Sequence, residues 1–92
     1  MNTKALAQVI RTESKGSTEK DGVIEIGDDT TLTVYANLGS ETLVIASVAS
    51  VSIVDELLMA TTTKGESYAV VAQDIRALRF GKGPSGRRTG LI

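Results

Sequence analysis

The chain has 92 residues, of which 41% are hydrophobic and 3% aromatic, and its 10 basic and 11 acidic side chains give a formal net charge of −1. It contains no cysteine and no histidine, which excludes disulfides, thiolate metal sites and the commonest general base. A chain of this size builds one modest core, which must come from Val, Ile, Leu and Ala.

The N-terminal residues, from about 2 to 15, are predicted to form an amphipathic helix. The apolar residues that recur there at helical spacing are Leu6, Val9 and Ile10. Asn2 or Thr3 can cap the first turn, because their side chains accept from backbone N–H groups. A helix this short is marginal in isolation, so we expect it to pack on a sheet or on a partner.

Six or seven short strands are predicted after a polar linker at residues 16–21. Each is a short apolar or alternating run, bounded by Gly, Asn, Ser or acidic residues that are typical of turns. The expected strands are residues 23–26, 32–36, 42–47, 50–53, 57–62 and 68–71, with a last one ending at Phe80.

Two stretches, residues 32–53 and 57–80, share one plan. Each has an apolar run, a turn at a glycine (Gly39 or Gly65), a second apolar run, and a closing segment with apolar residues spaced by three and then two. The closing residues are Val48, Val51 and Ile53 in the first stretch and Ile75, Leu78 and Phe80 in the second. We interpret the plan as a β-hairpin used twice, followed by a tight 3₁₀-like turn into a strand, with these closing residues buried. True duplication and chance repetition both remain open.

Three runs are apolar at consecutive positions: Leu43–Ile45, Leu57–Ala60 and Ala69–Val71. A strand that is apolar at every position has both faces covered. The helix can cover one face, a second subunit can cover it, or both can act together. Because so few aromatic residues are present to fill a self-contained core, we predict a homo-oligomer.

No catalytic residue, metal ligand or cofactor site is assigned. Serine and threonine are plentiful, but a nucleophilic serine needs a base, and histidine is absent. The acid pairs Asp28-Asp29 and Asp55-Glu56 lack the alternating ligand spacing of a calcium loop, so we interpret them as turn residues. We therefore expect a protein that is not an enzyme and that needs no cofactor.

The end of the chain is basic. Residues 79–92 contain four basic side chains and no acidic one, and residues 81–92 are predicted to be a flexible tail. The candidate nucleic-acid-binding residues are Arg79, Lys82, Arg87 and Arg88, with Arg76 beside them. Such residues bind phosphates, and single-strand binders add exposed aromatic residues, for which Tyr35 and Tyr68 are the candidates. A solvated tail without a binding role is the alternative.

No apolar run approaches the roughly 20 residues of a membrane span, and the first residues lack the apolar centre of a signal peptide. We therefore expect a cytoplasmic protein.

The layout of an N-terminal helix followed by a small bent sheet resembles that of Sm-like proteins, although their Asp-x-apolar-Met-Asn turn has no match. The run LLMATTTKGESYAVVAQDIRALRF at residues 57–80 resembles the strand–turn–strand ending of pleckstrin-homology-like and SH3-like domains. These resemblances imply a small β-barrel layout.

The sequence thus predicts a mainly β fold, a small barrel or rolled antiparallel sheet with one N-terminal α-helix, in a single domain at residues 1–80. A pseudo-symmetric two-hairpin sandwich is the alternative. The expected function is a non-enzymatic, self-associating protein-interaction or scaffold module. The alternative is a small nucleic-acid-binding β-barrel protein that uses its basic tail.

Overall fold

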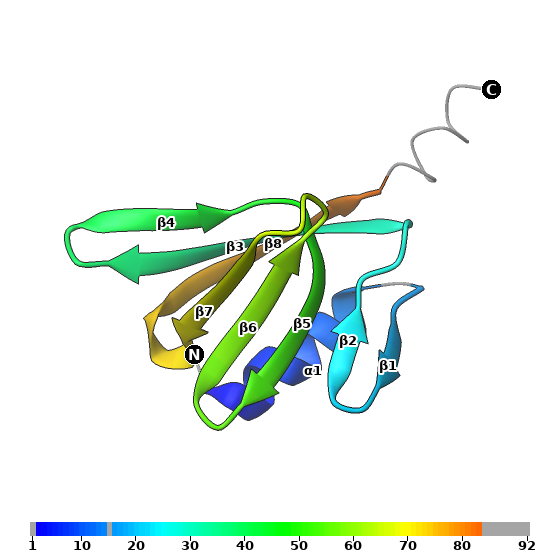
Figure 1. The fold of residues 1–92 in the computed structure, drawn as a ribbon, viewed down its shortest axis with the longest axis horizontal. Coiled ribbons are helices and arrows are strands. Elements are labelled where there is room, and N and C mark those ends of the chain that lie inside the picture. Colours follow the sequence, from blue (N-terminus) through cyan, green and yellow to red (C-terminus); the bar gives the residue numbers. More distant parts are fainter. Residues whose placement is uncertain (1, 15, 84–92) are drawn as a thin grey trace.

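A computed structural model describes residues 2–14 and 16–83 (Figure 1). The described residues are mainly in strands, with one α-helix near the N-terminus and one short 3₁₀ helix, η1. The elements are α1 (Thr3–Glu13), β1 (Thr18–Lys20), β2 (Val23–Glu25), β3 (Thr30–Leu38), β4 (Glu41–Ile45), β5 (Val48–Val54), β6 (Leu57–Thr62), β7 (Ser67–Val71), η1 (Ala72–Asp74) and β8 (Ile75–Lys82). The predicted mainly β fold with an N-terminal helix is confirmed.

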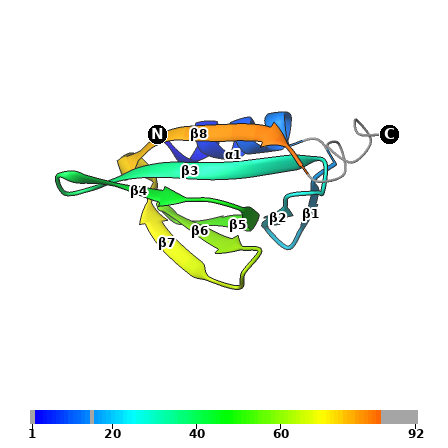
Figure 2. The ribbon, with the colours of Figure 1, turned by 90° about the horizontal axis from the view of Figure 1, so that it is seen from above.

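The strands form two antiparallel sheets (Figure 2). A five-stranded sheet has the order β1-β2-β5-β6-β7, and a three-stranded sheet has the order β4-β3-β8. The barrel expected from the sequence is not confirmed, because among the described strands no pairing joins one sheet to the other. The long β3–β4 hairpin extends beyond the rest of the two sheets (Figure 1).

Helix α1 covers one side of the five-stranded sheet. Its N-cap is Asn2, whose Oδ1 accepts a hydrogen bond of 2.8 Å from the Ala5 N–H. Leu6 and Ile10 are fully buried, whereas Val9, expected on the same apolar face, is 37% exposed. The helix lies behind β5 and β6 in Figure 1, so no described element covers the opposite, outer face of this sheet. At 11 residues, it is neither long nor apolar enough to cross a membrane, and no other described helix is.

The linker predicted at residues 16–21 contains a strand, β1, so this prediction is wrong. β1 and β2 form a hairpin in which Lys20 pairs with Val23, and the two residues between them, Asp21 and Gly22, have φ values of 54° and 80°. Asp-Gly with two positive φ angles is the sequence signal of a tight hairpin turn. The signal was present in the sequence, and the polar composition around it concealed the strand.

The hydrophobic core lies between the two sheets and α1. Its buried members are Leu6, Ile10, Ile24, Leu32, Val34, Ala36, Ile45, Val48, Val51, Leu58, Ala60, Val70, Ala72 and Ile75. As predicted from the composition, it is entirely aliphatic.

The two closing segments are only partly as expected. Val48, Val51 and Ile75 are buried, but Ile53, Leu78 and Phe80 are half-buried residues that pack against the core. For Leu78 and Phe80 the reason is that β8 is an edge strand, so one side of each residue has no neighbouring strand. The 3₁₀ turn exists as η1, but it precedes Ile75, and the first closing segment is strand throughout.

The folded part continues beyond the point where the tail was expected to begin. Gly81 and Lys82 pair with Thr31 and Thr30 of β3, and the Gly83 N–H donates a 3.0 Å hydrogen bond to the Asp29 carbonyl. A Cβ at Gly83 would overlap the carbonyl group of Asp28, so only glycine allows this approach.

Candidate interaction surfaces

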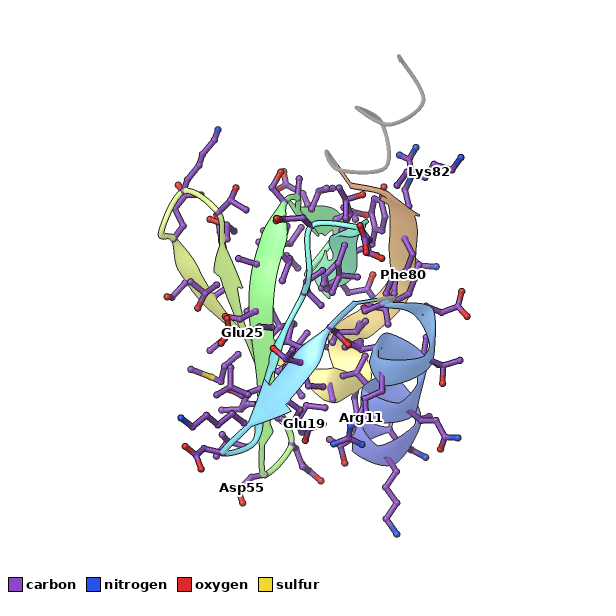
Figure 3. The ribbon with its side chains drawn as sticks, turned by 90° about the vertical axis from the view of Figure 1, so that its right-hand side faces the viewer. Arg11, Glu19, Glu25, Asp55, Phe80 and Lys82 are labelled. Atoms are coloured by element: carbon purple, nitrogen blue, oxygen red, sulfur yellow. The ribbon has the colours of Figure 1, made fainter. Side chains whose placement is uncertain are left out.

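The residues predicted to bind nucleic acid divide into two groups. Arg79 and Lys82 are exposed residues of β8, paired with Thr33 and Thr30. Figure 3 shows Lys82 at the end of β8, pointing away from the body. Arg87 and Arg88 lie outside the described residues.

Arg79 shares the outer face of the three-stranded sheet with an aromatic side chain. Tyr35 is half-buried on β3, between Val44 of β4 and Ala77 of β8. Arg79 pairs with Thr33, two residues before Tyr35 and therefore on the same face. A diagonal neighbour on a sheet lies roughly 7–8 Å away, so one ligand can span both side chains.

Arg76 joins this face through a β-bulge. Ala36 pairs with Ile75 and Tyr35 pairs with Ala77, which leaves Arg76 without a partner on β3. Bulges re-aim the side chain of the extra residue, and here the Arg76 Nη1 donates a 3.3 Å hydrogen bond to Oδ1 of Asn37. We call Tyr35, Asn37, Arg76 and Arg79 the basic face. Sequence reasoning placed Arg76 beside the candidates but missed Asn37, because the bulge that brings them together is not readable from the sequence.

The outer face of the five-stranded sheet is apolar over two cross-strand rows in β5, β6 and β7 and polar in the row Thr18–Glu25–Ser50–Thr61–Ser67. One cross-strand row is Val54–Leu57–Val71, and the next contains Val23–Ser52–Met59–Ala69. Val71 is 42% exposed, Val54 54% and Met59 38%. We call the residues Val23, Val54, Leu57, Met59 and Val71 the apolar sheet face.

The consecutive apolar runs therefore do not have both faces covered within one chain. In β6, Leu58 and Ala60 are buried while Leu57 and Met59 are exposed. β7 repeats the pattern, with Val70 buried and Val71 exposed. The helix packs on the side that the core already uses, so the second face has no cover from the described residues.

The acid pairs lie in turns. Asp28 and Asp29 lie between β2 and β3, while Asp55 and Glu56 join β5 to β6, with Asp55 at φ 55°. Among residues 2–14 and 16–83, no three acidic side chains gather into a group that could hold a metal ion. The positions of both pairs between strands agree with their interpretation as turn residues.

One ion pair ties α1 to β1 (Figure 3). The Arg11 Nε and Nη2 donate to the two carboxylate oxygens of Glu19 at 2.8 and 3.0 Å. These hydrogen bonds lower the pKa of the Glu19 carboxyl and raise that of the Arg11 guanidinium. Both side chains are exposed, so the pair orients the β1–β2 hairpin and stabilises the fold only slightly.

Comparison with protein-family models, with curated proteins and with solved structures found no match. The basic face and the apolar sheet face are the two candidate functional surfaces of the described residues.

Proposed function

We propose that this protein is a non-enzymatic interaction module that associates with copies of itself and offers the apolar sheet face to a protein chain. The observation that carries this proposal is the exposure of Leu57, Met59 and Val71 on strands whose other side is already buried. Contiguous exposed apolar residues mark interaction sites more often than free surface.

The charge distribution supports the same proposal. Within β5, β6 and β7 the two apolar rows contain no charged residue, whereas Lys20 of β1 and Glu25 of β2 lie at the β1–β2 end of the face. A neutral partner over β5, β6 and β7 therefore has no charged side chain of these rows to desolvate. The core of one chain is small and aliphatic. An obligate protein–protein interface resembles a hydrophobic core cut in half, so association through an apolar surface would enlarge the buried apolar area.

Light scattering of the full chain after size-exclusion chromatography tests self-association. The expected mass is a multiple of the 9.7 kDa chain that decreases on dilution. It should not depend on salt between about 0.05 and about 0.5 M, because apolar and backbone contacts are not screened as surface charges are. A monomer at every concentration up to hundreds of micromolar would falsify the proposal.

A second candidate function, binding of single-stranded nucleic acid, is favoured by one observation. The basic face places Arg76 and Arg79 beside Tyr35 on a sheet surface. Phosphate contacts from arginine combined with base stacking on an aromatic ring are the usual means of single-strand binding. The acidic remainder of the chain opposes this function, and we therefore rank it second.

A further inference from the structure

Strand β7 is an open edge of the five-stranded sheet. It pairs with β6 on one side, and no other described strand pairs with it. Figure 2 shows β7 as an outermost strand of the molecule. An open edge exposes a row of backbone N–H and C=O groups that can pair with another chain.

The hydrogen bonds at the two ends of the β6–β7 pair determine which groups face this edge. The Thr62 N–H donates to the Glu66 carbonyl and the Ala72 N–H to the Glu56 carbonyl, each at 2.8 Å. In an antiparallel pair, residue pairs that share backbone hydrogen bonds alternate with pairs that share none. Counting every second residue inward from Glu66 or from Ala72 gives the same set of bonded residues in β7. Tyr68 and Val70 bond to β6, whereas Ser67, Ala69 and Val71 direct their N–H and C=O groups to the open edge.

Of the edges in the described sheets, β7 is the least protected. β1 is three residues long and includes Glu19 and Lys20. β8 has a bulge and three basic residues, and β4 begins with Glu41. Short length, charge and bulges are the devices that block edge pairing. β7 is five residues, Ser-Tyr-Ala-Val-Val, without charge, proline or bulge.

We propose that two copies of the chain pair antiparallel through β7, about a two-fold axis at Ala69. This inference rests on the proposed self-association and specifies its contact. Ala69 faces Ala69 of the partner subunit, and Ser67 faces Val71 of the partner subunit. Each of the three edge-facing residues then donates one backbone hydrogen bond and accepts one, so the strand is self-complementary.

The side chains fit the same register. Tyr68 and Val70 point to the core side of the sheet, and in this register Tyr68 lies opposite Val70 of the partner subunit. This is a position without backbone bonds between the two residues, where side chains approach most closely, and aromatic with β-branched pairs are favourable there. Two five-stranded sheets become one continuous sheet.

Ala69→Pro is the main test. The proline removes an N–H that points to the open edge, and the β6–β7 bonds are untouched, so the fold is retained. We expect the dissociation constant of the oligomer to rise at least tenfold, with an unchanged circular dichroism spectrum.

The matched control is Val44→Pro. The hydrogen bond from the Gly83 N–H to the Asp29 carbonyl shows which residues of β3 bond to β8, and the alternate residues of β3 bond to β4. Tyr35 is one of those that bond to β8, so its partner Val44 directs its N–H to the open edge of β4. The control should leave the oligomer intact.

A charge pair tests the axis without proline. In the proposed dimer, residue 69 lies opposite residue 69 of the partner subunit. Ala69→Lys and Ala69→Glu should therefore each be monomeric, because two like charges would lie directly opposite each other. An equimolar mixture of the two should recover the mass of the wild-type oligomer. Thr61→Lys, on the same side of the sheet but one strand away from the edge and outside the apolar sheet face, should keep the wild-type mass.

The outcomes separate this inference from the proposed function. An oligomer that survives Ala69→Pro, or one that Val44→Pro or Thr61→Lys dissociates, overturns the β7 contact but keeps self-association. Failure of the lysine and glutamate variants to associate when mixed likewise counts against the axis at Ala69. A monomeric wild-type chain overturns both.

Discussion

Ala49 and Arg76 occupy equivalent positions in two strands of different sheets. Each is the extra residue of a β-bulge, and each directly follows the first buried residue of its segment, Val48 or Ile75. In a regular strand, successive side chains point to opposite faces of the sheet, and the extra residue of the bulge interrupts this alternation once. It therefore keeps apolar residues that are three apart, such as Val48 and Val51, on the same side of the sheet. The Ala49 carbonyl also accepts a 2.8 Å hydrogen bond from the Ile26 N–H, so this bulge extends the contact with the chain after β2.

Deletion of Ala49 tests this account. Without the extra residue, Val48 turns to the outer face, and the free energy of unfolding should fall by about 1.5–3 kcal/mol, the value of burying a valine. Ala49→Ser retains the bulge and should stay within about 0.5 kcal/mol of the parent. Urea denaturation measures both, and equal stability of the deletion and the parent would contradict the bulge.

The repeated spacing of three and then two could be read from the sequence, but its cause could not. The spacing fits a tight turn as well as a bulge, and only pairing with β3 or β6 decides between them. The tight turn itself is η1, which ends at Asp74 directly before Ile75 and has Val71 as its N-cap. The two segments share both the spacing and a β-bulge. The interpretation as a repeated hairpin did not predict the bulge.

The apolar strands and their turns were predictable because local chemistry determines them. Gly39 and Gly65 do turn the chain, at φ 64° and 85°. Which face of each strand stays uncovered was not predictable, because a consecutive apolar run carries no alternation. The basic face was equally hidden, since Asn37 and Arg76 are 39 residues apart in sequence.

Phe80→Ala should cost less than the loss of a fully buried residue. Phe80 is half-buried on an edge strand, while its pairing partner Leu32 is fully buried. We expect Leu32→Ala to lower the free energy of unfolding by about 2–5 kcal/mol and Phe80→Ala by about half the usual 3–5 kcal/mol. Thermal or urea denaturation measures which of the two variants loses more free energy of unfolding. A larger loss for Phe80→Ala than for Leu32→Ala would show that Phe80 is covered, for example by a partner.

Ser14→Ala should maintain or increase stability. Ser14 is 2% exposed at the C-terminal cap of α1, and its Oγ has no hydrogen-bond partner among the described residues. An unsatisfied buried hydroxyl costs about 1–3 kcal/mol, so its removal should gain up to about 1 kcal/mol in urea denaturation. A loss of more than about 0.5 kcal/mol would point instead to a bound water or another partner for this hydroxyl.

Glu19→Gln should change the pH dependence of stability. The hydrogen bonds from Arg11 lower the pKa of Glu19 in the folded state. Its contribution is therefore present above the unfolded value, about 4.3, and is lost as the pH falls through the lower folded value. We expect the variant to melt slightly below the parent at pH 7, with a difference that disappears under acid conditions. Glu41→Gln, at a glutamate without an ion pair to the described residues, is the control and should show no such trend.

The basic face and the C-terminal residues make separate predictions for nucleic acid. If the basic face binds, Arg76→Ala and Arg79→Ala should each weaken binding of labelled single-stranded RNA or DNA, measured by fluorescence anisotropy. Each lost phosphate contact should flatten the log–log salt slope by about 0.7. Tyr35→Phe keeps the stacking surface and should bind normally, and Lys20→Ala on β1 is the control for a distant basic residue.

Truncation after Gly83 decides between the two sources of charge. It removes Arg87 and Arg88 but leaves each strand of the described residues complete, so it should leave the melting temperature unchanged. Binding that survives the truncation and is lost with Arg76→Ala and Arg79→Ala belongs to the basic face. Binding that disappears on truncation alone belongs to the terminal arginines. We expect neither at physiological salt, because the described sheets also carry the acidic turns at residues 28–29 and 55–56, which repel a phosphate backbone. Micromolar, salt-sensitive binding by the full chain would overturn that expectation and make nucleic-acid binding the preferred function.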